Sequence, residues 1–398
     1  MLFALAVVAV AVVALPWNAD VAPWAPLELP TISAFTAEQI ATIESYVNAV
    51  WLPSLLSIIA GPVAAVTVLL VPSLRQRLCS FGPARRPVLR DLLVGALLLV
   101  IVRVAALPWL LWTASVRREA GLLLTSWPEE LLRWLAETAV YVVLGSTGIA
   151  LALSVLRRAP RRGWIALVVL GVVAAALISA VVPLIQRLEG TQADARLAAR
   201  VQAVAQDLGV DVGDVVIIET GDRSPVLNAN VSGWGPTRAV TLYDTLAAGA
   251  TEAEIDALVA HELIHVREND VVIGSVLAVL GTGAVVAFAA ALVLSPGVRR
   301  RLGARSSGDA PVIPLLVAVV LVGALAGTVL ASTASRQIEA RADHEAVAAT
   351  GDPAAYDDLM VRLATTNRST LTPPQWRYAL FFTHPTPLQR LAATSSSD

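Results

Sequence analysis

The segment LVAHELIHVREND, residues 258–270, places two histidines four residues apart with a glutamate between them. In an α-helix, residues i and i+4 project from the same face, so His261 and His265 can offer imidazole nitrogens to one metal ion. Glu262 lies one step further round the helix, close to such an ion without being a ligand. Two imidazoles that hold zinc beside a carboxylate that acts as general base are typical of a metallopeptidase. The alternative is a pair of surface histidines on an amphipathic helix.

A third metal ligand is expected further along the chain, because catalytic zinc usually has three protein ligands and one open position. SRQIEARAD, residues 335–343, supplies Glu339 and Asp343, again four apart on one helical face. Glu339 is the natural third ligand. Asp343 can accept a hydrogen bond from the outer nitrogen of a ligand histidine and so fix its tautomer. Taken alone, this segment would equally suit a solvated charged helix. The single cysteine, Cys79, has no second cysteine with which to form a disulfide or share a metal.

The remainder of the chain is strongly apolar. Of its 398 residues, 56% are hydrophobic and 15% are charged, which predicts a membrane protein rather than a soluble core. Apolar runs of about 20 residues can cross a hydrocarbon layer about 30 Å thick. Seven runs are predicted to span the membrane: 2–15, 49–71, 92–112, 135–156, 164–185, 271–294 and 312–334. The first is short, and its alternative is a cleaved signal peptide. Because a basic start is missing, an anchor is favoured.

One predicted span carries a charge. Arg103 lies in the middle of the run 92–112, where a charge is costly unless it faces other helices or water. Glu137 lies near the end of the next span. Both side chains are therefore expected to face a polar interior among the helices rather than lipid.

The chemistry lies in two polar segments, 187–270 and 335–398. The first predicts a helix, then strands in DVVIIET and RAVTLY, then the HExxH helix. The two spans between the segments return the chain to the same side, so the segments can form one site. Asp270 directly precedes one of these spans and Ser335 directly follows the other, so both motif helices are expected to continue out of membrane helices.

The sequence thus predicts a mainly α, multi-pass membrane protein of about seven transmembrane helices with a small α+β, zincin-like catalytic domain at the membrane surface. Four segments make up this organisation. They are an N-terminal region of five spans (1–186), the first part of the catalytic domain (187–270), a transmembrane hairpin (271–334) and the second part of the catalytic domain (335–398).

Four motifs carry a resemblance to a known family: VTLYDTL, HELIHVREND, SRQIEARAD and THPTPLQRL, in this order. They resemble the membrane zinc metallopeptidases that include the type 1 CAAX prenyl protease and the bacterial heat-shock protease HtpX. TLYDTL and the number of spans lean toward the prenyl-protease branch. The resemblance covers roughly the last 200 residues. It implies one zinc ion bound by His261, His265 and Glu339, with Glu262 as general base and Asp343 outside the ligand set.

The resemblance also gives roles to the C-terminal motif. His384 can donate to the oxyanion of the tetrahedral intermediate, or occupy the open position of zinc when no substrate is bound. A plain loop histidine is the alternative. Arg390, six residues on, is expected to pair with Asp343 or another carboxylate of the site rather than with the substrate.

A peptide substrate needs a place to lie in extended form. The segment 228–233 would be an edge strand on which such a peptide pairs through backbone hydrogen bonds. Asn228, Ala229 and Asn230 are therefore the predicted substrate-binding residues.

The predicted function is that of a zinc-dependent metalloendopeptidase that cleaves membrane-associated or misfolded polypeptides. One alternative, an intramembrane site-2-type protease, is disfavoured because 251–270 is too charged to lie in lipid. A second alternative is a catalytically silent, zinc-stabilised membrane sensor or chaperone-like protein. Glu262 argues against it, because a structural zinc site needs no base. The expected partners are a polypeptide and the bilayer. A net charge of −2 gives no reason to expect nucleic acid.

Arginine distribution predicts the orientation in the cell membrane. The loops after the second, fourth and sixth spans hold five, four and four arginines, and positive charge stays cytoplasmic in short loops. The catalytic segments should then lie outside the cytoplasm. The eukaryotic relatives have theirs in the cytosol, so the resemblance points the other way. A chain rich in alanine, arginine and valine and free of lysine is typical of a GC-rich bacterial genome.

Overall fold

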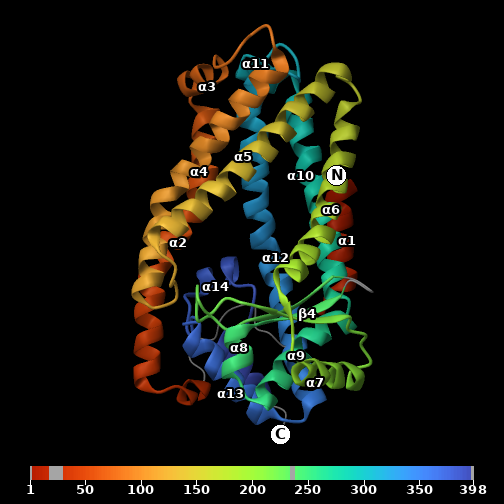
Figure 1. Ribbon diagram of the computed structural model, residues 1–398. Helices are drawn as coiled ribbons and strands as arrows, with labels where there is room; N and C mark the ends of the chain where they lie inside the picture. Colours follow the sequence, from red (N-terminus) through yellow and green to blue (C-terminus); the bar gives the residue numbers. More distant parts are fainter. Residues whose placement is uncertain (1, 18–29, 234–237, 396–398) are drawn as a thin grey trace.

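The computed structural model describes residues 2–17, 30–233 and 238–395. Within these ranges, six helices are long and apolar enough to cross a membrane, and they match six of the seven predicted spans. They are α2 (Ala37–Leu70), α4 (Pro87–Glu119), α5 (Trp127–Arg158), α6 (Gly163–Glu189), α10 (Asp270–Leu294) and α12 (Ile313–Thr350). A small sheet and several short helices lie together at one end of the helices (Figure 1). The predicted fold class, a multi-pass helical membrane protein with a small α+β part, is confirmed.

The first predicted span is a shorter helix, α1 (Leu2–Ala14), of 13 residues. At 1.5 Å per residue it is about 20 Å long, which is less than the thickness of the hydrocarbon layer. It packs against α10, where the ring of Phe3 lies directly over the backbone of Gly283. A Cβ at this position would lie 2.6 Å from the ring, so a larger residue would require Phe3 to move.

The helix α2 extends well beyond its apolar run. Thr36 caps its first turn and exchanges hydrogen bonds with Gln39, which sets the start of the helix. Its 34 residues make a rod about 51 Å long. Phe35, Ile43 and Val47, near its start, are buried in the core of the end of the molecule that carries the sheet and the HExxH helix, which is called the catalytic end below. The N-terminal region therefore contributes side chains to the same core as the motif helices.

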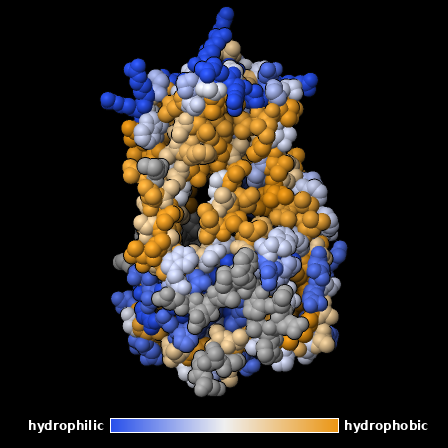
Figure 2. Space-filling view, turned by 180° about the vertical axis from the view of Figure 1, so that it is seen from behind, coloured by the Kyte–Doolittle hydropathy of each residue, from blue (hydrophilic) through white to orange (hydrophobic). Residues whose placement is uncertain are grey.

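The arginine-rich loops lie at the opposite end of the molecule from the sheet. They contain α3 (Pro72–Cys79), the α5–α6 turn and α11 (Pro296–Leu302), and Figure 1 shows α3 and α11 at the top, far from α9. Figure 2 shows a hydrophobic band between two hydrophilic ends. At the arginine-rich end, Arg157 pairs with the buried Asp91 at 2.6 Å and donates to the Gly308 carbonyl at 2.8 Å. The loops are thus fastened to one another across the helix ends.

The sheet has four short strands in the order β1-β2-β4-β3. They are β1 (Thr191–Gln192), β2 (Asp214–Ile218), β3 (Ala229–Ser232) and β4 (Ala239–Tyr243). β2 and β4, the two β-branched runs of the sequence, pair in parallel at the centre. β3 pairs antiparallel with β4 and lies at the edge, next to α9.

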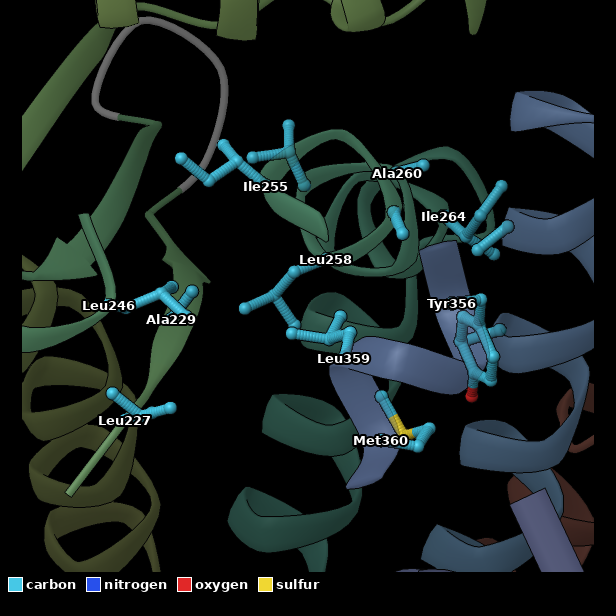
Figure 3. Packing of buried hydrophobic residues seen from close by; sticks show 14 of the residues in the cluster. Leu227, Ala229, Leu246, Ile255, Leu258, Ala260, Ile264, Tyr356, Leu359 and Met360 are labelled. Atoms are coloured by element: carbon cyan, nitrogen blue, oxygen red, sulfur yellow. The ribbon is translucent and has the colours of Figure 1, made fainter. Parts of the chain in front are cut away.

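The sheet lies among a group of shorter helices at the catalytic end. These are α7 (Ala195–Asp207), α8 (Asp244–Gly249), α9 (Glu252–Arg267), α13 (Pro353–Thr366), α14 (Gln375–Phe381) and α15 (Pro387–Ser395). Figure 3 shows side chains of β3, α8, α9 and α13 gathered in one cluster, with Leu258 and Leu359 at its centre. Ile264, inside the HExxH motif, is fully buried there, near Tyr356. The motif helix is therefore held by apolar packing on the side away from its histidines.

The two motif helices meet their spans differently. α12 runs without a break from the membrane through Ser335 to Thr350, as predicted. The prediction that the HExxH helix continues into the next span is wrong, because α9 ends at Arg267 and α10 starts at Asp270. Asn269 between them has a φ of 62°, a left-handed conformation that asparagine tolerates and that ends a right-handed helix.

Arg103 has polar and aromatic partners, as its place in the middle of a span requires. Its Nε donates to Thr138 Oγ1 at 3.0 Å, and its Nη2 lies 3.6 Å from Glu137 Oε2. Its guanidinium also lies over the rings of Trp134 and Tyr141. Arg103 and Glu137 line a cavity of about 660 Å³ bounded by α4, α5 and loops of the sheet. Figure 2 shows the surface hollowed between the helices just above the catalytic end.

Candidate metal centre and active site

The start of α9 is fixed by a capping box, which sets the rotation of the helix. Thr251 accepts from the backbone of Glu254, and the Glu254 carboxylate accepts from the backbone of Thr251 at 2.6 Å. Arg362 of α13 donates to the same carboxylate at 2.7 Å. Burial opposes ionisation of Glu254, but the bonds from Arg362 and Thr251 outweigh it and lower its pKa. The helix then presents His261 and His265 toward α12.

The three predicted ligands converge. The Nε2 atoms of His261 and His265 lie 3.3 Å apart, and Glu339 Oε2 is 3.2 Å from Nε2 of His261. All three ligand atoms lie within 4.8 Å of one another. Zinc bonds of about 2.0–2.1 Å in a tetrahedron place ligand atoms about 3.3–3.4 Å apart. Two of the three separations are close to this value, and Nε2 of His265 lies 3.8 Å from Oε1 of Glu339, so the three groups fit a zinc ion after a small movement of the glutamate.

His261 is oriented by a buried chain of polar groups. Its Nδ1 lies 2.9 Å from Asp343 Oδ1, and Arg390 donates to Asp343 at 2.8 and 2.5 Å. Arg390 also donates to the hydroxyl of Tyr356 at 3.3 Å. Burial alone would lower the pKa of His261, but the carboxylates of Asp343 and Glu339 raise it to about 10. The pocket therefore stabilises positive charge at the place where a metal ion would lie.

His265 has a similar arrangement that the sequence did not reveal. Its Nδ1 lies 3.0 Å from Oδ2 of Asp270, and Arg341 Nη2 donates to both oxygens of that carboxylate, at 2.6 and 2.7 Å. Asp270 is visible in the sequence only as a carboxylate five residues after His265. Its role depends on the chain reversal at Asn269, which helical spacing does not predict.

Glu262 lies beside the edge strand. Its carboxylate accepts a hydrogen bond from the backbone N–H of Val231, and burial raises the pKa of Glu262. The Tyr243 N–H donates to the Asn228 carbonyl at 3.0 Å, so 228 and 230 are the positions whose backbone groups pair with β4. The backbone groups of Ala229 and Val231 therefore point to the free edge of the sheet.

The predicted substrate segment thus lies next to the carboxylate, but its three residues differ in placement. Asn228 is exposed, Asn230 is half-buried opposite Thr241, and the Ala229 side chain is buried in the core. Sequence reasoning missed Val231, since strand register decides which amide faces outward.

His384 lies in the turn between α14 and α15, close to the cluster. Its Nε2 is 3.3 Å from Glu339 Oε2, and its Nδ1 is 2.9 Å from the hydroxyl of Thr383. Burial lowers its pKa, which favours the neutral imidazole. The segment before it is held by the buried Arg336 of α12, whose Nη1 donates to the carbonyl of Phe382 at 2.6 Å. His344, by contrast, is exposed and lies outside the cluster.

The TLYDTL motif has a structural explanation. The carboxylate of Asp244 accepts from the backbone N–H groups of Thr220 at 2.8 Å and Gly221 at 3.1 Å. Although burial opposes it, these bonds lower the pKa of Asp244 and keep it ionised. The residue fastens the turn after β2 to the start of α8, one element before the HExxH helix.

Comparison with known proteins agrees with these features. The model of peptidase family M48 matches residues 191–397, more than half of the chain. A protease HtpX homologue of Campylobacter curvus is 32% identical over 175 residues, which are 44% of this chain and 58% of that protein. A protease HtpX homologue of Campylobacter concisus is 36% identical over 146 residues, 36% of this chain and 49% of that protein. The chain thus spans only about half the length of the curated relatives it matches.

A solved structure extends the likeness to the membrane helices. The crystal structure of S. mikatae Ste24p superposes with a TM-score of 0.78 at 19% identity, covering 99% of this chain and 97% of that one. At this identity the match shows a shared fold. Together with the family match, it confirms the resemblance seen in the four motifs. The chain belongs to peptidase family M48 and has the fold of Ste24p.

Proposed function

We propose that this chain is a zinc-dependent endopeptidase embedded in the cell membrane. The observation that carries the proposal is the convergence of His261, His265 and Glu339 beside the Glu262 carboxylate. The family match and the relatives described as proteases support the same reaction class. His261, His265 and Glu339 would hold one zinc ion.

The other groups have separate roles in peptide-bond hydrolysis. When bound, zinc supplies a Lewis acid that polarises the scissile carbonyl and activates water at neutral pH. Glu262 takes the proton from the attacking water and passes it to the leaving amine. Neutral His384 donates a hydrogen bond to the oxyanion. The free edge of β3 offers the backbone groups of Ala229 and the carbonyl of Val231, which pair with the backbone of an extended substrate and hold it along Glu262.

The position of the site favours membrane-associated or misfolded polypeptides as substrates. Glu339 lies five residues beyond the apolar run 312–334 on the continuous helix α12, within about 10 Å of the bilayer boundary. A folded soluble domain would have to unfold locally to lie along β3, whereas an unfolded or membrane-tethered segment already offers an extended backbone.

The purified full-length chain should contain about one zinc ion per molecule and cleave an unfolded protein. A chelator should abolish cleavage, and added zinc should restore it, because the ligand set holds the Lewis acid that the reaction needs. Metal analysis and gel-based proteolysis measure both. Undiminished cleavage by metal-free protein would contradict the proposal. Zinc binding without any cleavage would favour a silent, zinc-stabilised protein instead.

We further propose that the catalytic end faces away from the cytoplasm. The three arginine-rich loops lie at the end of the helices opposite to α9 and Glu339 (Figure 1). Short loops rich in arginine remain cytoplasmic, which supports a metal centre on the other side of the membrane.

Two single-cysteine variants can test this orientation. Cys79 itself is a poor probe, because it is buried and burial raises its pKa to about 11. In a Cys79→Ala background, Ser80→Cys marks the arginine-rich end and Asp222→Cys marks an exposed turn near the sheet. A membrane-impermeant maleimide should label the Asp222→Cys variant in intact cells and the Ser80→Cys variant only after permeabilisation. The reverse pattern would place the catalytic end in the cytoplasm.

A further inference from the structure

Each histidine of the candidate metal centre is backed by an aspartate that is itself held by an arginine. For His261 these are Asp343 and Arg390, and both follow the sixth and seventh predicted spans in the chain. For His265 they are Asp270 and Arg341. The second set differs in its carboxylate, because Asp270 is the first residue of α10, whereas Arg341, like Asp343, lies on α12.

We propose that Asp270, held in place by Arg341, is a positioning residue that fixes the ring of His265 and so ties the metal centre to the transmembrane hairpin of α10 and α12. This inference deepens the proposed zinc-dependent function and rests on it. Asp270 does not lie among the ligand atoms. It acts through His265.

The geometry suits this role. The Asp270 side chain is 7% exposed and that of Arg341 is 18% exposed, so neither is free to reorient in water. Arg341 Nη2 bonds both oxygens of Asp270, and Oδ2 also accepts from Nδ1 of His265 at 3.0 Å. A carboxylate that accepts from Nδ1 leaves the lone pair of Nε2 directed at the metal and raises the basicity of the ring. The arginine fixes the orientation of the carboxylate.

The break at Asn269 is what allows this contact. If α9 continued as a regular helix, residue 270 would lie about 140° round the helix from His265 and would point away from it. The left-handed Asn269 instead turns the chain, so that the first residue of the next helix reaches the ring. The same residue therefore begins a membrane helix and orients a metal ligand.

The test is zinc affinity of the full-length protein in detergent, measured by competition with a chelator. Asp270→Asn should weaken zinc binding about 10- to 100-fold, as loss of such a supporting group commonly does. Arg341→Gln should weaken it less. Because Arg341 acts only through Asp270, the double variant should bind zinc no more weakly than Asp270→Asn alone. The absorption spectrum of the cobalt-substituted protein should shift in Asp270→Asn, which reports the ligand arrangement rather than stability.

A matched control lies on the same helix. Asp256 of α9 is paired by Arg200 through two bonds of 2.6 Å but does not contact a histidine of the cluster. Asp256→Asn should leave zinc affinity and the cobalt spectrum unchanged. If Asp270→Asn does not fold, Arg341→Gln alone tests the inference, because it is also expected to lower zinc affinity and to shift the cobalt spectrum.

The inference would be overturned if Asp270→Asn bound zinc as tightly as the wild type or, where that variant does not fold, if Arg341→Gln did so. It would also be overturned if Asp256→Asn lost as much zinc affinity as Asp270→Asn. Fully additive effects in the double variant would contradict it as well. Failure of the proposed function looks different. In that case the unaltered protein itself would bind no zinc or cleave no polypeptide.

Discussion

Replacing Glu262 with glutamine is expected to remove nearly all peptide-bond cleavage while leaving zinc bound. The variant keeps the size of the side chain and its place beside Val231, but an amide cannot accept the proton of the attacking water. General acid–base catalysis contributes roughly 10²- to 10⁴-fold, so the turnover number should fall by at least about two orders of magnitude. Turnover of an unfolded protein and zinc content by metal analysis are the measurements.

Glu252→Gln provides the control for this change. Glu252 lies in the first turn of the same helix, half-exposed, where it pairs with Arg200, and its removal should leave turnover unchanged. Full activity in Glu262→Gln would exclude the proposed base. If the variant is inactive as expected, it can also hold substrates in native membranes without cutting them, so that mass spectrometry can identify them.

Replacing Glu339 with alanine is expected to remove zinc from the protein, and cleavage with it. Two imidazoles alone bind zinc much more weakly than the three-ligand set. Asp343→Asn should retain zinc with an affinity reduced by about 10- to 100-fold, because Asp343 lies against Nδ1 of His261 and outside the group of three candidate ligands. Zinc content and affinity measured for both variants separate the two roles.

Equal and complete loss of zinc in both variants would make Asp343 a direct ligand. Glu345→Ala is the matched control, since Glu345 lies on α12 six residues after Glu339 and pairs with Arg267 at the end of α9. Its removal breaks a link between the same two helices without touching the metal site. Zinc content should not change.

The convergence of the three candidate ligands could be predicted because their spacing follows from helix geometry. His261 and His265 share a face wherever the helix lies, and Glu339 follows from the need for a third ligand. The membrane helices could be predicted because length and hydropathy alone fix them. Residue spacing does not show where a long helix leaves the membrane. α2 is an example, because Ile43 and Val47 near its polar start are buried in the core of the catalytic end.

The residues that were missed depend on local chain reversals and on register. Asp270 reaches His265 only because Asn269 adopts a left-handed conformation. Val231 reaches Glu262 only because the pairing of β3 with β4 turns its amide to the free edge. Arg336 is a conspicuous charge in the sequence, but it holds the C-terminal segment through the backbone carbonyls of Tyr378 and Phe382, which no side-chain pattern reveals.

The two apolar runs 271–294 and 312–334 lie between His265 and Glu339 in the chain, and this sets the order in which the site is completed during synthesis. During translation, His261 and His265 are synthesised before either apolar run of the hairpin. Glu339 is synthesised only after both runs. His384 comes later still. On the proposed function, a chain that ends before Glu339 has only two of the three candidate zinc ligands. The proposed active site is therefore completed only after both apolar runs have been synthesised.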